Sequence, residues 1–125
     1  MMLFLVAVVA IGAALSACGP LALGSCTPKG GSTAPGASTA QVVADPNTVG
    51  AYQPANLTIR AGQSVTWKWV DTGNQHSVTA DDGGFDSCLK RAGSTFTVTF
   101  GKPGTYGYRC SIHPQMIGRI TVNPA

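Results

Sequence analysis

One stretch near the C-terminus, residues 103–118, decides the fold: PGTYGYRCSIHPQMIG. From Thr105 to Cys110, polar or small residues alternate with aromatic ones, as in a half-buried β-strand. The stretch continues as Cys-x-x-His-x-x-Met, which contains Cys110, His113 and Met116, and the only other histidine of the chain is His76. A strand that ends in this motif indicates a β-fold with a metal site at one end.

These four side chains supply one thiolate, two imidazoles and one thioether. Two His and one Cys, with Met on a long axial bond, form the ligand set of a blue-copper site. Zinc fits less well, because closed zinc sites take four Cys or His and methionine is not among their usual ligands. Considered singly, Met116 would be core filler and His76 a hydrogen-bonded structural histidine. Their combination with Cys110 and His113 favours one copper ion.

Short segments of alternating apolar and polar residues predict strands at residues 56–60, 64–70, 95–100, 105–110 and 118–122. Gly and Pro separate them, and no helical period of useful length is present. The residues expected on the inward faces are Phe96, Val98, Phe100, Tyr106, Tyr108, Cys110, Ile120 and Val122. Several short strands at this spacing indicate an all-β sandwich or barrel.

The N-terminus resembles an export signal. Residues 1–15 are apolar, about as long as the apolar region of a secretory signal and shorter than the roughly 18–20 residues of a spanning helix. The sequence Leu-Ser-Ala-Cys that ends at Cys18 resembles the lipobox of bacterial lipoproteins. We therefore expect a signal peptide at residues 1–17, an acylated Cys18 and an exported, membrane-anchored protein. No Lys or Arg precedes the apolar run, and the alternatives are an ordinary signal peptide or an uncleaved anchor.

The next segment differs in composition. Residues 19–40 are almost entirely Gly, Pro, Ser, Thr, Ala and Leu, which bury too little apolar area to offset the entropy of ordering. We expect residues 18–40 to form a lipid-anchored flexible tether with a reach of roughly 25 Å. Residues 41–125 then form one small domain.

The charge of the chain argues against nucleic-acid binding. The formal net charge is +3, from eight basic and five acidic residues, and the basic residues are scattered. No basic run with interleaved aromatic residues is present, so we expect no nucleic-acid partner.

A set of motifs carries a resemblance to a known family: residues 52–59, Gly62, Val65, Trp67, His76-Ser77-Val78, Phe85-Asp86-Ser87, Phe96, Phe100 and residues 103–118. Together they resemble the plastocyanin and azurin family of cupredoxins over nearly all of residues 41–125. The short spacing of the ligand motif is most similar to that of amicyanin and related bacterial proteins. The resemblance implies a Greek-key β-sandwich that holds one type 1 copper ion and carries electrons between a donor and an acceptor redox protein in the cell envelope.

The resemblance also implies roles for single residues. The copper ligands would be His76, Cys110, His113 and Met116. In the family, the C-terminal ligand histidine reaches the surface within an apolar patch and passes electrons to partners. This role falls here to His113, with Pro114, Ile112 and Met116 around it, and with Pro54 if the fold places it nearby.

Two pairs of residues remain. Ser77 stands where the family often has Asn, so Ser77 and Ser111, each next to a ligand, are expected to tie the ligand loops together in a different way. Cys26 and Cys88 are left once lipid and copper have taken the other cysteines. They could pair, because an exported compartment permits disulfides. A buried thiol at Cys88 or a disulfide to another protein are the alternatives.

Two other functions use copper sites of related chemistry. Oxidases and nitrite reductases of the wider family need a second copper site with further histidines, and this chain has only two. We therefore expect no enzyme activity. A copper carrier or storage protein with the same ligands is the alternative to an electron-transfer protein.

Overall fold

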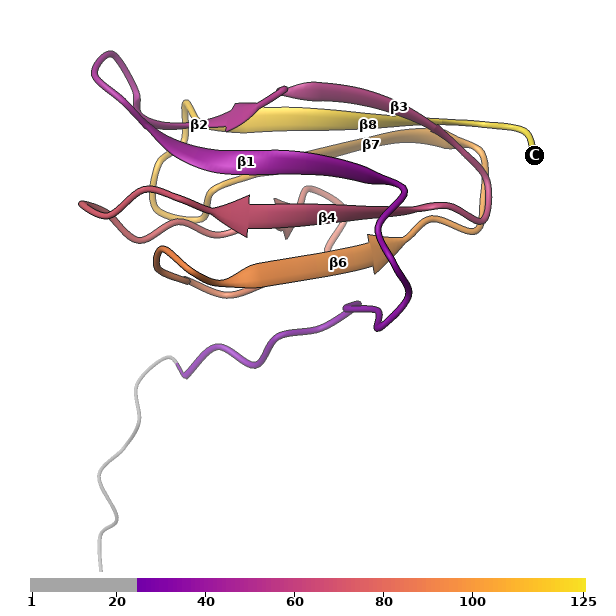
Figure 1. Ribbon diagram of the computed structural model, residues 1–125, viewed down its shortest axis with the longest axis horizontal. Helices are drawn as coiled ribbons and strands as arrows, with labels where there is room; N and C mark the ends of the chain where they lie inside the picture. Colours follow the sequence, from indigo (N-terminus) through magenta and orange to yellow (C-terminus); the bar gives the residue numbers. More distant parts are fainter. Residues whose placement is uncertain (1–24) are drawn as a thin grey trace, which may run out of the picture.

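The computed structural model describes residues 25–125, which form eight strands and no helix. The strands are β1 (Ser38–Asp45), β2 (Val49–Gln53), β3 (Asn56–Arg60), β4 (Ser64–Trp69), β5 (Thr79–Ala80), β6 (Thr95–Thr99), β7 (Gly104–Arg109) and β8 (Ile117–Asn123). They build two four-stranded sheets, with the orders β2-β1-β4-β6 and β3-β8-β7-β5 (Figure 1). This arrangement confirms the expected all-β sandwich. Within residues 25–125, no helix is long and apolar enough to cross a membrane.

The connections follow a Greek-key pattern. β1 pairs in parallel with β4, and β3 pairs in parallel with β8, while the other neighbouring strands are antiparallel. Parallel neighbours cannot be joined by a tight hairpin, so the chain crosses between the sheets. As a result, the loop after β4 and the loop between β7 and β8 can meet at one end of the sandwich.

The five expected strands are present, whereas β1, β2 and β5 were not predicted. In β1 only Ala40 and Val42 are buried, and the small polar residues around them look like linker. β2 contains Gly50, a residue that is unfavourable in strands. β5 has two residues and exists only through its pairing with β7.

The core lies between the two sheets and is rich in aromatic side chains. Trp67 is fully buried, with its ring centroid 5.2 Å from that of Tyr108 and 5.9 Å from that of Phe85. The expected inward faces are confirmed: Phe96, Val98, Phe100, Tyr108, Cys110, Ile120 and Val122 are buried, and Tyr106 packs against this core while partly exposed. Each large apolar side chain buried in this way contributes about 1.5–3 kcal/mol.

The segment that precedes β1 is part of the domain. Residues 26–37, the N-terminal strap, run past β6 before the chain enters β1 (Figure 1). Ser32 N donates to Thr97 O at 2.7 Å, and Ala37 N donates to Ser64 O at 2.8 Å. The prediction of a flexible tether is therefore wrong for residues 26–40, and the domain begins well before residue 41. The composition of the strap gave the wrong prediction, because backbone hydrogen bonds hold the strap on the sandwich.

Glycine suits the strap because the chain passes very close to the sandwich. Gly30 has a φ of 71°, and a Cβ added there would lie 2.8 Å from Phe85 Cβ. Gly31 packs on the ring of Phe96, where an added Cβ would lie 3.2 Å from a ring carbon. The same glycines that indicated flexibility in the sequence thus permit close packing. The expected signal peptide and the acylated Cys18 lie outside the described residues.

A disulfide closes the strap. Cys26 is bonded to Cys88, with the two Cα atoms 5.7 Å apart, so the proposed pairing is present. Next to it, Lys29 and Asp86 exchange backbone hydrogen bonds of 2.9 and 3.0 Å. The cross-link joins residues 62 positions apart and restricts the unfolded chain more than the folded one.

We predict that replacing both Cys26 and Cys88 by Ser lowers the free energy of unfolding by about 2–4 kcal/mol, because the unfolded chain regains the entropy of an open loop. Urea unfolding of the metal-free protein measures the change. Wild-type protein treated with a reductant is the control and should match the double variant. Equal stability of oxidised wild type and variant would contradict the prediction.

Candidate metal centre

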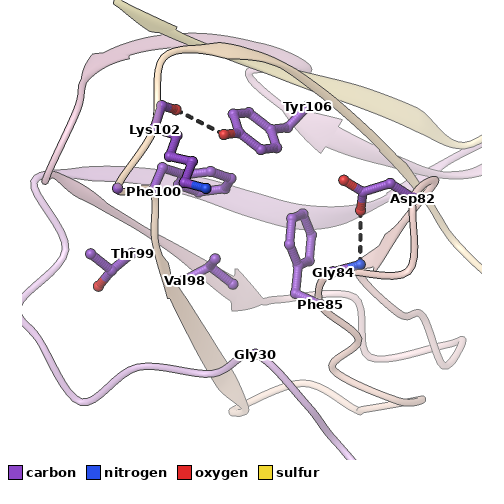
Figure 2. A pocket seen from close by; sticks show the side chains of 10 residues that line it. Gly30, Asp82, Gly84, Phe85, Val98, Thr99, Phe100, Lys102 and Tyr106 are labelled. Atoms are coloured by element: carbon purple, nitrogen blue, oxygen red, sulfur yellow. Dashed lines mark hydrogen bonds between the residues drawn. The ribbon is translucent and has the colours of Figure 1, made fainter. Parts of the chain in front are cut away.

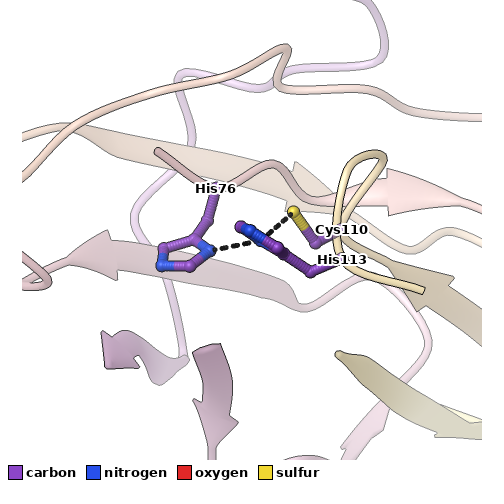
Figure 3. A group of neighbouring side chains, drawn as sticks. All are labelled: His76, Cys110 and His113. Carbon is purple, nitrogen blue, oxygen red and sulfur yellow. Dashed lines mark hydrogen bonds between the residues drawn. The ribbon is translucent and has the colours of Figure 1, made fainter. Parts of the chain in front are cut away.

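Three potential ligand atoms converge at one end of the sandwich. His76 Nδ1 lies 3.2 Å from His113 Nδ1, which lies 3.4 Å from Cys110 Sγ (Figure 3). All three atoms fall within 4.8 Å of one another. Ligands bonded to one small ion at about 2.0–2.3 Å and at trigonal or tetrahedral angles lie roughly 3.3–3.7 Å apart. The three side chains are therefore spaced as the ligands of a single metal ion.

Met116 lies close to this group, because its side chain and that of His76 both pack against the backbone of Gly50. A Cβ added at Gly50 would lie 2.8 Å from Met116 Sδ and 2.9 Å from His76 Nδ1, and would also collide with His76 Cε1. Both donor atoms therefore face Gly50, and Met116 is 1% exposed. The structure thus brings together all four residues that the sequence singled out. It adds Gly50, which no sequence signal indicated, because its neighbours come from two other segments.

The C-terminal ligand loop, residues 110–116, closes on itself between β7 and β8. Cys110 N donates to Met116 O at 3.0 Å, and Met116 N donates to His113 O at 2.9 Å. These bonds hold the three side chains of the motif in a compact turn. Cys110 and Met116 are buried, whereas His113 is half-buried, so His113 leads from the donor cluster towards solvent.

His76 comes from the opposite side and is held independently of any metal. Its backbone N donates to Lys90 O at 3.1 Å, and its carbonyl accepts from Lys90 N at 2.9 Å. The indole N–H of Trp69 also donates to His76 O, at 2.8 Å. The ring is fully buried. Its position is therefore set by the folded chain before a metal arrives.

Asp71 is a site residue that sequence reasoning missed. Its Oδ2 lies 2.6 Å from His76 Nε2, and its Oδ1 accepts from the backbone N–H of Gly73 at 2.7 Å and of Asn74 at 3.3 Å. A carboxylate in this place keeps the proton on Nε2 and leaves the lone pair of Nδ1 for the site. The hydrogen bond from His76 is the main reason why the pKa of Asp71 lies below its ordinary value. The motif Asp-x-Gly indicates a turn, but not that its carboxylate would meet His76.

Ser77 and Ser111 connect the two ligand-bearing loops, as expected. Ser111 N donates to Ser77 Oγ at 2.8 Å, and the two hydroxyl oxygens are 3.1 Å apart. Ser77 N lies 3.4 Å from Cys110 Sγ and donates to it. A short serine can therefore bridge the loops directly and place a hydrogen bond on the cysteine sulfur.

The surroundings of the donor atoms are mostly neutral. Burial is the main reason why the pKa values of Tyr52 and Tyr108 are raised, and the pKa of Tyr108 is about 12. Both phenols therefore stay protonated. Tyr52 donates to Ser77 O at 2.5 Å. The pKa of His113 is lowered, first by partial burial and then by the nearby His76. The arrangement favours the uncharged imidazole of His113, the form that binds metals.

A groove of about 290 Å³ lies beside the half-buried His113. It is lined by Asn47, Thr48, Val49, Ile112, His113, Pro114 and Gln115. Ile112 and Pro114 are exposed, as expected for a surface patch. Met116 is too buried to contribute to this patch, contrary to expectation, and Pro54, expected there only if the fold placed it nearby, does not line the groove. The turn between β1 and β2 takes their place, because the parallel pairing of β1 with β4 brings it to this end.

A larger cleft, of about 430 Å³, has different walls (Figure 2). Phe85, Phe100 and Tyr106 face it, with Lys102 and Asp82 at its rim. It contains no Cys, His or Met, so it offers none of the soft ligands gathered around His76.

We predict that Asp71→Asn lowers the stability of the metal-free protein by about 1–3 kcal/mol at neutral pH. Because the folded-state pKa of Asp71 is depressed, its contribution is present above the ordinary value of about 3.9 and is lost as the pH falls through the folded value. The variant should therefore show a flatter loss of stability in acid. Urea unfolding between neutral pH and about pH 3 measures both effects.

Asp81→Asn is the control, because Asp81 forms an exposed ion pair with Arg109 at 2.9 Å, and such pairs contribute little. If Asp71→Asn and wild type lost stability equally in acid, the buried pair of Asp71 and His76 would not be the cause of the loss of stability at low pH.

Comparison with known proteins agrees with this geometry. Residues 38–123 match the family described as copper binding proteins, plastocyanin/azurin family. The chain is 33% identical over 85 residues to chloroplastic plastocyanin of Oryza sativa subsp. indica, which covers 58% of this chain and 54% of that protein. It is 33% identical over 76 residues to amicyanin-alpha of Methylorubrum extorquens, covering 57% and 63%. The chain thus spans little more than half the length of these curated relatives.

The fold comparison gives the same result. A novel purple cupredoxin from Nitrosopumilus maritimus is similar with a TM-score of 0.56 and 32% sequence identity, covering 67% of this chain and 99% of that one. The family match extends over most of the chain and includes all four candidate ligands. The cofactor of this family is one copper ion, which suits the donor set of two imidazoles, a thiolate and a thioether. The chain therefore belongs to the plastocyanin/azurin family of copper-binding proteins.

Proposed function

We propose that this protein carries single electrons by means of one type 1 copper ion held by His76, Cys110, His113 and Met116. The convergence of His76 Nδ1, His113 Nδ1 and Cys110 Sγ within 4.8 Å is the observation that carries the proposal. Bound copper supplies the one-electron exchange between Cu(I) and Cu(II). Every other requirement, namely position, exclusion of water and access for a partner, is met by side chains of this chain.

The ligand frame is rigid, which suits electron transfer. His76 is held by Lys90, Trp69 and Asp71, and the ligand loop is closed by its own backbone hydrogen bonds. A frame set by the fold imposes one compromise geometry on both oxidation states, so little has to move when an electron is exchanged. A carrier or storage protein must also release its metal, and three buried side chains, His76, Cys110 and Met116, disfavour release.

His113 supplies the path to the surface. It is the half-buried member of the four, and its neighbours Ile112 and Pro114 are exposed beside the groove. A donor or acceptor protein that docks there would come close to a ligand ring without opening the site. The chain contains no histidine beyond His76 and His113, so we assign it no catalytic copper site and propose no enzyme activity.

We place the protein in the cell envelope, exported and attached to a membrane through lipid on Cys18. The disulfide between Cys26 and Cys88 supports this location, because disulfides persist in oxidising compartments. The apolar N-terminal run followed by Leu-Ser-Ala-Cys supplies the lipobox-like signal.

We predict that the metal-free protein turns intensely blue with one equivalent of Cu(II) and bleaches reversibly on reduction. The colour requires a thiolate bonded to Cu(II), so Cys110→Ser should abolish it, as visible absorption spectra will show. The double variant Cys26→Ser/Cys88→Ser is the matched control and should stay blue. A colourless complex that does not exchange electrons would refute electron transfer and favour a copper carrier.

We predict that the full chain partitions into detergent and that Cys18→Ala releases it or leaves it unprocessed. Several acyl chains are needed for stable anchoring, because one holds only weakly. Phase separation in detergent and mass spectrometry of the mature N-terminus test this, with the double variant Cys26→Ser/Cys88→Ser, which keeps Cys18 and leaves neither partner of the disulfide unpaired, as the control. An unmodified mature terminus at another residue would rule out the anchor.

A further inference from the structure

The peptide unit between His76 and Ser77 lies beside the metal centre and uses both of its hydrogen-bonding groups. Its N–H, that of Ser77, donates to Cys110 Sγ at 3.4 Å. Its oxygen, His76 O, accepts from the backbone N–H of Lys90 at 2.9 Å and from the indole N–H of Trp69 at 2.8 Å. A carbonyl oxygen has two lone pairs, so both are engaged here. One peptide unit therefore connects Trp69 to the sulfur of Cys110.

The hydrogen bond from Trp69 is not needed to satisfy this carbonyl. The oxygen of His76 already accepts from Lys90 N, and one partner is enough for a buried carbonyl. A buried indole does not find a partner automatically either. Trp67 is buried in the same core, and its Nε1 has no hydrogen-bond partner among residues 25–125. Burial alone therefore does not explain the bond that Trp69 makes.

Hydrogen bonds that follow one another along a peptide unit strengthen each other, because each donor polarises the unit. The indole N–H draws electron density towards the oxygen of His76 and makes the N–H of Ser77 a stronger donor. We propose that Trp69 strengthens the hydrogen bond on the Cys110 thiolate through this peptide unit and thereby raises the reduction potential of the bound copper. This inference rests on the proposed function and adds a residue outside the ligand set that acts on the sulfur through the backbone.

The direction of the effect follows from charge. Reduction of Cu(II) to Cu(I) adds one electron and makes the site less positive. A hydrogen-bond donor presents its positive end to the sulfur, so it stabilises the reduced site more than the oxidised site. Trp69, His76, Ser77 and Cys110 are each at most 2% exposed. Dipoles act strongly where water is excluded, so the buried position of this chain of groups suits the effect.

The test compares Trp69→Phe with Trp67→Phe. Both variants exchange a buried indole for a smaller ring, but only Trp69→Phe removes a hydrogen bond. In Trp69→Phe, the ratio of Cu(I) to Cu(II) at a fixed potential should fall by roughly two- to fourfold, which lowers the reduction potential by about 18–36 mV at about 59 mV per tenfold. Trp67→Phe should leave the potential unchanged.

A second measurement does not depend on the colour or the potential of the site. The deuterium fractionation factor of the Ser77 amide, measured by NMR in mixtures of H2O and D2O, reports the strength of its hydrogen bond. In Trp69→Phe this factor should rise in both the metal-free and the Cu(I) protein, because a weaker hydrogen bond retains more deuterium. Trp67→Phe should again match wild type.

A change of the opposite sign is available without loss of the indole. In a Trp67→Phe background the only remaining tryptophan is Trp69, so growth on 5-fluorotryptophan places fluorine on that ring alone. Fluorine withdraws electron density and makes the indole N–H a stronger donor. The reduction potential should then rise, and the fractionation factor of the Ser77 amide should fall. This comparison decides the question if Trp69→Phe does not fold.

Three results would overturn the inference. The first is an unchanged potential and an unchanged Ser77 amide in Trp69→Phe. The second is an equal change in Trp69→Phe and Trp67→Phe, which would assign the effect to looser packing. The third is a lower potential with an unchanged Ser77 amide, which would show that the effect does not pass through the peptide unit. A colourless wild type would instead refute the proposed function, while the metal-free protein would still test the link between Trp69 and Ser77.

Discussion

The hydrogen bond between His76 Nε2 and Asp71 Oδ2, at 2.6 Å, is the interaction on which the metal centre depends. It fixes both the tautomer and the orientation of a fully buried ring, so that Nδ1 faces Cys110 and His113. A buried group that loses its hydrogen-bond partner costs about 1–3 kcal/mol, which makes the ring hard to turn. The opposing ligand loop holds its own shape, and the site forms where these two rigid parts meet.

The N-terminal strap also helps to hold His76 in place. Cys26 is bonded to Cys88, and two residues later Lys90 exchanges both backbone hydrogen bonds with His76. The disulfide therefore anchors the segment that holds the first ligand. A small domain gains stability from such a cross-link, because its core alone buries only a modest share of its surface.

The sequence by itself determined the strands with a clear period and the identity of the donor atoms. Alternation predicted β3, β4, β6, β7 and β8, because successive side chains of a strand point to opposite faces. The spacing of Cys110, His113 and Met116 predicted one turn with three donors, because ligands that close together in the chain must also be close in space. His76 could be added because the chain contains no other histidine to consider.

Only the tertiary structure decided which residues support these donors. Asp71 and Gly50 are unremarkable in sequence. Asp71 acquires its role because the folded loop after β4 brings its carboxylate onto the ring of His76, and Gly50 acquires its role because two distant segments bring His76 and Met116 against it. The strap is another segment whose role cannot be predicted from its sequence. Its composition is that of a linker, yet backbone hydrogen bonds and the disulfide hold it on the sandwich. Local patterns report periodicity and chemistry, whereas long-range backbone pairing and close approach depend on where the folded chain brings its segments together.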